Sequence, residues 1–567
     1  MKRTFLKCAL GALAAACPLV ASYSQQSTPV SPWGVAAGHD TSWGPSSWAA
    51  AVAAAGVHTV RGFADYPDTF AVLQNNGFKA KGILMWSPDG QPFGFPVNNL
   101  DSWASYVRDI VTRYAGSVDS WEVWNEPPNF TADVSPASYA KIVQVAYNTA
   151  KAAVPGVRIG LAAKSVHIKW LAESIDAGAK GYYDYITLHP YEPAGLVRQG
   201  WEGEYMAIAP TVRKMLAEKD PARANVPIEF TEVGIPTNWP ARTFSYAVPE
   251  PVQADLLVKY YTMGIAQGVS QIDWFEAWDG DTPDPATSGA PFGLITRDSR
   301  KRPVYYALKS LVGYLGQNPS YLGWTNFGGA GYGFYFRRGQ IVVLVGWANS
   351  DQQIPLNFST GLVAVTPGTF ASKRVTSLQL TSSPRIVLAD PGTSETVTWA
   401  QDAQQSRSKP FPWGGDYSGV SSVSIVAGQP DQGLHWVNKP GLVSIDGVPA
   451  YSMVGQSGAA FTVDPNFLSW TSQRITVTAV VRKVGDGAAG FNLKYESTAP
   501  ISTTDGNGFN YGPNCWCNVP AGGPTTFTWV LDNPRFVGMF GVNLTLDSDS
   551  AQYANYAIER ITVTKTP

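Results

Sequence analysis

The sequence predicts an α/β fold: a (β/α)8 TIM barrel, then a small β-sandwich domain, then a C-terminal, jelly-roll-like β-sandwich. Between about residues 33 and 316, short apolar strand-like runs alternate with helix-like segments. Eight such alternations are typical of a closed parallel barrel. After about residue 317 the pattern changes to short alternating strands separated by Gly, Asp, Asn and Pro turns, which is typical of β-sandwiches.

The predicted barrel strands are rich in β-branched and aromatic residues. In chain order they are WGVAAG, TVRGF, KGILMW, SWEVWNE, RIGLAA, YITLHPY, IEFTEVG and IDWFEAW. In the helix-like segment DSWASYVRDIVTRYAG, residues Trp103, Val107, Ile110 and Val111 recur at helical spacing. A doubly wound open sheet is the competing architecture, but no glycine-rich phosphate loop follows a strand.

The N-terminus resembles a targeting segment. Lys2, Arg3 and Lys7 precede the apolar run CALGALAAACPLVA, which predicts a secretory signal peptide over residues 1–24 and a secreted or periplasmic protein. LAAAC weakly resembles a lipoprotein box, so a lipid anchor at Cys17 is the less favoured alternative. No other segment is long and apolar enough to span a membrane.

Composition excludes some partners and leaves the role of the C-terminal region open. The formal net charge of −2 gives no electrostatic footprint for nucleic acid.

We expect the barrel over residues 25–317, the small β-sandwich over 318–402 and the C-terminal sandwich over 403–567, with the polar stretch 401–410 as a linker. The C-terminal sandwich either binds carbohydrate or braces the barrel. Cys515 and Cys517 offer too few ligands for a metal site, and we expect no cofactor.

Functional side chains of such barrels lie at the C-terminal ends of the strands. By that rule one mouth should collect Arg61, Trp86, Asn125, Glu126, His189, Tyr191, Glu232 and Trp278. His39, Asp40, Trp43 and Trp239 also follow strands, and packing explains them equally well.

Glu126 and Glu232, after strands four and seven, are the informative pair. Glycoside hydrolysis needs one carboxyl group to protonate the leaving oxygen and a second to attack the anomeric carbon or activate water. The two need different pKa values. Apolar neighbours such as Trp124 predict a raised pKa for Glu126, whereas cationic and hydrogen-bonding neighbours should keep Glu232 ionised.

Three further glutamates lie on predicted strands four, seven and eight. Glu122 shares the direction of Glu126 and should join a polar network in the barrel interior. Glu229 lies three residues before Glu232, so strand alternation predicts that it faces the outer helices. Glu276 is either a substrate ligand or a member of the interior network.

WEVWNEP and FTEVG, with LHPY between them, resemble the signatures of glycoside hydrolase clan A. Within the clan the chain most resembles family 39, which groups β-xylosidases with bacterial exopolysaccharide hydrolases; the closing run FGLITRDSRKRPVYYAL also fits. The resemblance covers about residues 30–400 and implies a retaining β-glycosidase with Glu126 as acid/base and Glu232 as nucleophile.

The same resemblance implies roles around the two carboxylates. Asn125 would bind the sugar 2-hydroxyl, and Tyr191 and Arg61 would contact Glu232. His189 would shape the pocket, and Trp278 would form a stacking floor; Trp86 is either a second sugar platform or loop packing. The substrate is expected to be a polysaccharide or oligosaccharide. A transglycosylase with the same carboxylates, and a non-catalytic carbohydrate-binding protein, are the alternatives.

Overall fold

The computed structural model describes residues 31–37, 48–63, 67–87, 94–239, 242–279, 289–349, 352–409, 411, 416–506, 508–513 and 516–566. The expected signal segment 1–24 with Cys17 lies outside the described residues. So do His39, Asp40, Trp43 and Cys515.

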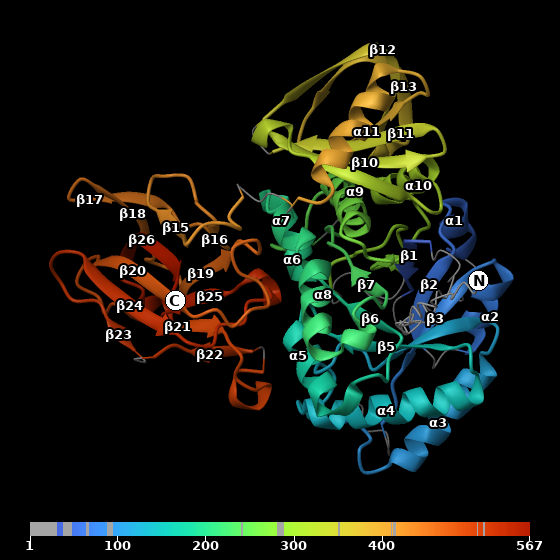
Figure 1. Ribbon diagram of the computed structural model, residues 1–567, viewed down its shortest axis with the longest axis horizontal. Coiled ribbons are helices and arrows are strands. Elements are labelled where there is room, and N and C mark those ends of the chain that lie inside the picture. Colours follow the sequence, from blue (N-terminus) through green and yellow to red (C-terminus); the bar gives the residue numbers. More distant parts are fainter. Residues whose placement is uncertain are drawn as a thin grey trace, which may run out of the picture.

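The N-terminal half is a closed barrel of eight parallel strands in the order β1 to β8 (Figure 1). The strands are β1 (Trp33–Ala36), β2 (Thr59–Phe63), β3 (Lys79–Leu84), β4 (Val118–Val123), β5 (Arg158–Ala163), β6 (Tyr185–Leu188), β7 (Ile228–Val233) and β8 (Gln271–Trp274). Parallel pairing of β1 with β8 closes the ring. The predicted (β/α)8 barrel is confirmed, and the open doubly wound sheet is excluded.

Helices surround the barrel, because each presents one apolar face to the strands. They are α1 (Ala49–Ala54), α2 (Pro67–Asn75), α3 (Leu100–Arg113), α4 (Pro136–Ala153), α5 (Ile168–Ser174), α6 (Tyr191–Leu196), α7 (Glu202–Met206), α8 (Ile208–Lys219), α9 (Glu250–Ala266) and α10 (Pro303–Leu315). α3 buries Trp103, Val107, Ile110 and Val111, the spacing that predicted it. Among the described residues, no helix is both long and apolar enough to cross a bilayer.

The middle region is one antiparallel sheet in the order β13-β12-β14-β11-β10-β9. Its strands are β9 (Ser320–Thr325), β10 (Gly331–Arg338), β11 (Ile341–Ala348), β12 (Ile354–Thr366), β13 (Ala371–Leu380) and β14 (Arg385–Ala389). Helix α11 (Ser394–Ser406) packs on one face, where Trp399 lies 5.9 Å from Tyr335 between ring centroids. On the other face, Phe334 and Trp347 join the core of the barrel.

The expectation of a linker over residues 401–410 is wrong for its first six residues. Residues 401–406 form the last turns of α11, so the expected boundary between residues 402 and 403 falls inside a helix. Thr393 caps that helix, accepting a hydrogen bond from Thr396 N, and Ala403 is fully buried against the sheet. The polar composition that suggested a linker is that of a helix with one solvent-facing side.

The C-terminal region is a β-sandwich of two antiparallel sheets. Its strands are β15 (Ser422–Val426), β16 (Leu434–Trp436), β17 (Leu442–Ile445), β18 (Val448–Ser452), β19 (Gly458–Val463), β20 (Ile475–Lys483), β21 (Gly490–Glu496), β22 (Phe509–Tyr511), β23 (Cys517–Asn518), β24 (Thr525–Leu531), β25 (Leu544–Asp547) and β26 (Tyr556–Lys565). Burial alternates along β20, as expected for a strand with one face in the core. The predicted order of a barrel followed by antiparallel β-regions is confirmed.

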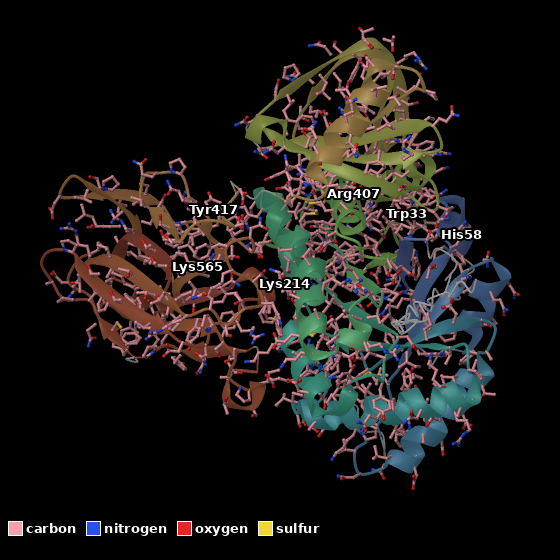
Figure 2. All side chains as sticks on the ribbon, in the orientation of Figure 1. Trp33, His58, Lys214, Arg407, Tyr417 and Lys565 are labelled. Carbon is pink, nitrogen blue, oxygen red and sulfur yellow. The ribbon has the colours of Figure 1, made fainter. Side chains whose placement is uncertain are left out.

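The sandwich packs against the barrel on the side of α5 to α8 (Figure 1). Lys214 on α8 faces the sandwich (Figure 2) and donates a hydrogen bond to Ser469 Oγ at 2.6 Å. Glu218 accepts from Trp470 Nε1 and Arg535 Nη1, both at 2.9 Å. We call this contact the seam.

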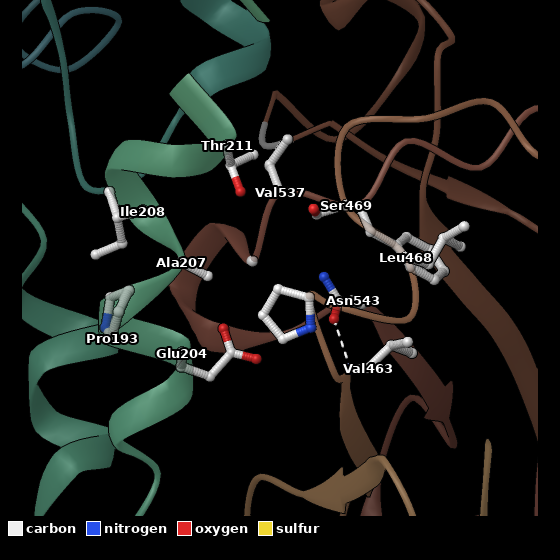
Figure 3. Close-up of a pocket in the computed structure, with 13 residues that line it drawn as sticks. Pro193, Glu204, Ala207, Ile208, Thr211, Val463, Leu468, Ser469, Val537 and Asn543 are labelled. Atoms are coloured by element: carbon white, nitrogen blue, oxygen red, sulfur yellow. Dashed lines mark hydrogen bonds between the residues drawn. The ribbon is translucent and has the colours of Figure 1, made fainter. Parts of the chain in front are cut away.

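The seam also contains a buried carboxylate. Figure 3 shows Glu204 of α7 directed toward the sandwich, beside Val463 and Asn543. Glu204 is 6% exposed and accepts a hydrogen bond from the Thr462 hydroxyl. The sandwich is therefore joined to the barrel through polar groups that both sides bury.

Candidate active site

Arg61 on β2 organises the polar cluster at the barrel mouth. Its Nε and Nη2 donate to the two carboxylate oxygens of Glu122 at 3.0 and 2.9 Å, and Nη2 also donates to Asn125 Oδ1 at 2.8 Å. Its Nη1 donates to Glu232 Oε1. Because β2, β4 and β7 are not all neighbours, these side chains meet across the barrel interior.

The charge of Arg61 is secured by the carboxylates around it. The residue is 2% exposed, and burial disfavours its charge. The charges of Glu122 and Glu232 outweigh that effect and raise the pKa of Arg61 above its ordinary value. Burial likewise raises the pKa of Glu122, but Arg61 outweighs it and lowers that pKa overall. Glu122 is thus an ionised member of the expected interior network.

Glu232, near the end of β7, is held by two hydrogen-bond donors. Arg61 binds Oε1, and the Tyr191 hydroxyl donates to Oε2 at 2.8 Å. His189 Nδ1 lies 3.6 Å from the same Oε2. At 8% exposed, the carboxylate is nearly enclosed by these partners. The hydrogen bond from Tyr191 that the resemblance implied is present.

Glu126 lies three residues after the end of β4, on strained backbone. Its φ is +48° and that of Trp124 is +69°, a left-handed region that non-glycine residues rarely adopt. His189 Nδ1 lies 2.7 Å from Glu126 Oε1, and Asn129 Nδ2 donates to Oε2 at 3.4 Å. Such strain tends to persist where surrounding contacts enforce a functional geometry.

The expected raised pKa of Glu126 is wrong. Burial raises it, but the hydrogen bond and charge of His189 outweigh burial and leave the pKa well below its usual value. Trp124 is fully buried and packs on Phe95, with ring centroids 5.1 Å apart. His189, which follows β6, therefore sets the charge of Glu126, whereas the apolar ring of the neighbouring Trp124 does not.

His189 links the two candidate catalytic carboxylates. One oxygen of Glu126, one oxygen of Glu232 and one ring nitrogen of His189 all lie within 4.8 Å of one another. Burial lowers the pKa of His189, but the charge of Glu232 and the bond to Glu126 outweigh it and raise that pKa. Nε2 lies 3.1 Å from Thr231 Oγ1, so both ring nitrogens are engaged. This trio could ligate a metal, but its hydrogen bonds fit proton exchange better.

Below the mouth lies a second buried network, which corrects the expectation for Glu229. Lys81 on β3 pairs with Glu229 on β7 and lies 3.8 Å from Asp273 on β8. Strands β3 and β7 are not neighbours, so Glu229 faces the interior and not the outer helices. The register of β7 against β8 shifts between Phe230 and Val233, and this bulge lets Glu229 and Glu232 share a face.

Glu276 lies just after β8 and near the cluster. It is 6% exposed. Burial, together with the charges of Asp279 and Glu232, raises its pKa well above the usual value. A neutral carboxyl group here can donate a hydrogen bond, so the alternatives of substrate ligand and interior network member both stand.

The three tryptophans predicted as sugar platforms all make contacts with the protein itself. Trp86 is half-buried and stacks on Tyr106, with ring centroids 6.2 Å apart. Trp278 is 8% exposed and forms a bridge with Ile295. Trp239 donates its indole N–H to Gly289 O at 2.8 Å. Their contact with sugar stays a prediction.

Sequence reasoning missed Lys81, Thr231 and Asn129. Lys81 lies between Ala80 and Gly82 inside an apolar strand, a signal that would have indicated an interior ion pair. Thr231 and Asn129 had no such signal, because their contacts come from the bulge in β7 and the turn after Glu126.

Neither a known family profile nor a curated protein matches the sequence. A family 39 glycoside hydrolase from the gut symbiont Bacteroides cellulosilyticus WH2 matches with a TM-score of 0.52 at 17% identity, over 64% of this chain and 81% of that chain. The barrel fold is shared with a glycoside hydrolase. Two family 30 xylanases, from Clostridium acetobutylicum and Clostridium papyrosolvens C71, match 64% of this chain and 96% and 97% of their own, at 12% and 13% identity with TM-scores of 0.45 and 0.46. At these identities the likeness shows the fold alone.

Proposed function

We propose that the chain is an exported, retaining β-glycoside hydrolase that acts on a polysaccharide or oligosaccharide. The observation that carries this is the pair of carboxylates Glu126 and Glu232. Glu126 follows β4 and Glu232 lies near the end of β7, and one oxygen of Glu126 lies within 4.8 Å of one oxygen of Glu232. Retaining enzymes separate the two carboxyl groups by about 5–5.5 Å, and inverting enzymes need about 6.5–9.5 Å to admit a water. The short separation supports retention.

The surroundings of the two carboxylates support different roles. Glu232 is bound by Arg61 and Tyr191, which stabilise a carboxylate anion and aim one oxygen, as a nucleophile requires. Glu126 is bound by His189, a group that can hold and return a proton. Asn125 accepts from Arg61 through Oδ1, which leaves its amide N–H groups to bind the sugar 2-hydroxyl.

The proposed reaction has two displacements. In the first, Glu232 forms a bond to the anomeric carbon while Glu126 gives its proton to the glycosidic oxygen, and the alcohol leaves. In the second, Glu126 takes a proton from water, the water oxygen bonds to the anomeric carbon, and Glu232 is released. Because Glu126 has a lowered pKa, we propose that His189 stores the proton of this pair and that substrate binding returns it to Glu126.

Export rests on the N-terminal sequence alone. The basic residues and apolar run within residues 1–24 are the features that a secretion signal requires. Expression with its own N-terminus, followed by mass spectrometry of the exported chain, tests this: loss of the segment supports export, and an intact cytoplasmic chain contradicts it.

The activity is tested by reducing-sugar release from a panel of β-linked polysaccharides and aryl β-glycosides. Glu126→Gln and Glu232→Gln keep side-chain shape and remove the acid or the nucleophile. Asp109→Asn, an exposed carboxylate on α3, is the matched control. Cleavage by the parent and the control, lost in both glutamine variants, supports the proposal. Undiminished activity in the glutamine variants contradicts it.

Two outcomes of the same panel point to the alternatives. Longer products that appear only with added acceptor sugar indicate transglycosylation by the same carboxylates. Binding of a glycan without cleavage by the parent indicates a carbohydrate-binding protein.

A further inference from the structure

The C-terminal sandwich reaches the barrel mouth through two loops, beside the loops that follow β5 and β6. In the first contact, His167 Nδ1 accepts from Trp170 N at 3.3 Å, so its Nε2 carries the hydrogen and donates to Gly506 O at 3.1 Å. Burial lowers the pKa of His167 to about 3, which keeps the ring neutral for this bond. The sandwich is thus fixed at the rim of the mouth as well as along the seam.

The second loop carries Phe540, in a 3-10 turn (Met539–Gly541). Buried Glu496 fixes this turn, because its carboxylate accepts from the backbone N–H groups of Val537, Gly538 and Met539 at 2.8, 3.1 and 2.7 Å. Asn543 Nδ2 donates to the same carboxylate at 2.8 Å.

The turn sits directly on α6, the helix that begins at Tyr191. A Cβ on Gly541 would lie 2.4 Å from Leu196 Cδ1, so a larger residue there would have to displace the Leu196 side chain. Phe540 itself has φ +55° and ψ +18°, a left-handed conformation that is costly for a bulky residue. The fold therefore holds an aromatic side chain at the rim in a conformation that glycine would adopt more easily.

Phe540 faces a lysine that lies next to the acid/base. The Lys164 ammonium is 5.7 Å from the centroid of the Phe540 ring. The Lys164 backbone N–H donates to the carbonyl of Pro127, the residue after Glu126, at 3.1 Å. The next residue, Ser165, accepts from His189 N at 3.3 Å and donates to Glu192 Oε2 at 2.6 Å.

Lys164 is half-buried, and in the described part of the chain no carboxylate lies within salt-bridge distance of its ammonium group. Burial lowers its pKa, and the more distant charges of Glu126, Glu192 and Asp505 oppose that effect. An ammonium group beside an aromatic face, with carboxylates further out, offers both the stacking surface and the hydrogen bonds that a neutral sugar ring uses.

We propose that Phe540 and Lys164 form a subsite for the sugar unit on the leaving-group side, so that the C-terminal sandwich completes the substrate cleft. This inference rests on the proposed function. Glu126 protonates the leaving oxygen, so the departing sugar lies on the side of Glu126, where Lys164 and Phe540 are. The ring face stacks on the sugar, and the ammonium group donates to its hydroxyls.

The test compares two substrates of the sugar that the panel identifies: its 4-nitrophenyl β-glycoside and its β-linked trisaccharide. Phe540→Gly removes the ring and suits the left-handed backbone, so the variant should fold. We expect kcat/KM on the trisaccharide to fall about 10-fold, with KM affected more than kcat, because an aromatic contact of this size contributes about 1–1.5 kcal/mol. Activity on the nitrophenyl glycoside should stay within about 2-fold of the parent, since its leaving group does not need the subsite.

Phe540→Tyr keeps the ring and should retain trisaccharide activity. Tyr511→Ala removes an exposed aromatic of the same sandwich and should change neither rate. Equal loss on both substrates, or no loss on the trisaccharide, overturns the subsite while leaving the proposed function intact. If the parent cleaves nothing on the panel, both proposals are overturned.

Discussion

Two groups of buried carboxylates, one at the barrel mouth and one at the seam, have opposite electrostatics. At the mouth, Arg61 and His189 lower the pKa values of Glu122 and Glu126. At the seam, Glu204 accepts from a hydroxyl; near it in the sandwich, the buried Asp464 accepts from the Asn466 backbone N–H, and Glu496 accepts from backbone N–H groups and a side-chain amide. Their pKa values are raised by burial, to about 8 for Glu204 and about 7 for the other two.

The comparison shows which factor decides the charge of the buried acids in these two groups. Burial raises the pKa in both places, and hydrogen bonds from neutral donors do not reverse it at the seam. Arg61 reverses it for Glu122, and His189 reverses it for Glu126. At the mouth, Glu122 and Glu126 therefore offer ionised oxygens for chemistry, whereas burial brings the pKa values of the three other carboxyl groups close to neutral pH.

The largest expected effect comes from the two catalytic candidates. Glu232→Gln and Glu126→Gln should each lower kcat/KM by roughly 10³-fold or more, because each removes a group that acts directly on the reacting bond. Melting temperature should change little in either. A steady-state assay on the best substrate, with circular dichroism as the folding check, measures this. Residual activity within 10-fold of the parent in both variants contradicts the assignment.

Removing the cation at the mouth should come next. Arg61→Met leaves Glu122 and Glu232 buried without their partner, which costs about 3–5 kcal/mol of unfolding free energy. It should also lower kcat/KM by roughly 10²-fold, because Glu232 loses the hydrogen-bond donor that fixes its Oε1. Arg61→Lys, which keeps the charge without the fork of donors, should recover stability in part. Urea denaturation of the three proteins checks the order; equal stability of parent and Arg61→Met is the contrary result.

The pair of His189 and Glu126 predicts a pH profile. The raised pKa of His189 means that the pair keeps its proton through the usual titration range of histidine. The acid step is available below that pKa and is lost as pH rises through it, so kcat/KM should have an alkaline limb above about pH 6.5. His189→Gln should shift this limb and lower the maximum by roughly 10-fold. If the variant has the same alkaline limb as the parent, His189 does not hold the proton that the acid step uses.

The smallest expected effect on activity is at the seam, where the change is in folding stability alone. The folded pKa of Glu204, about 8, lies above its ordinary value of 4.5, so folding stability falls as pH rises between these values. Each pH unit costs at most about 1.4 kcal/mol. Glu204→Gln should flatten this dependence. Glu218 gives the opposite pH dependence. Arg535 lowers the pKa of Glu218, so the folding stability that this residue contributes is lost as pH falls. Thermal melts from pH 5 to 8 decide it, and an unchanged slope in Glu204→Gln counts against the account.

The sequence was sufficient for features that depend on periodicity. Eight apolar runs and helical spacing in segments such as α3 predicted the barrel, and the rule of strand ends brought Arg61, Glu126, His189 and Glu232 together. It failed where geometry departs from regular alternation or comes from distant contacts. A bulge turned Glu229 inward, and His189, 63 positions from Glu126, set its charge. The placement of Phe540 on the rim depends on packing between domains, which no local pattern records.

The most direct test of the central claim is to trap the covalent intermediate on Glu232. Activated 2-deoxy-2-fluoro β-glycosides of the common sugars slow both displacements, and an activated leaving group lets the first proceed. Mass spectrometry of the digested enzyme should find one fluoroglycosyl group on the peptide that contains Glu232, and none in Glu232→Gln. Label on another carboxylate, or none from the sugar that the enzyme cleaves, would contradict a double displacement through Glu232.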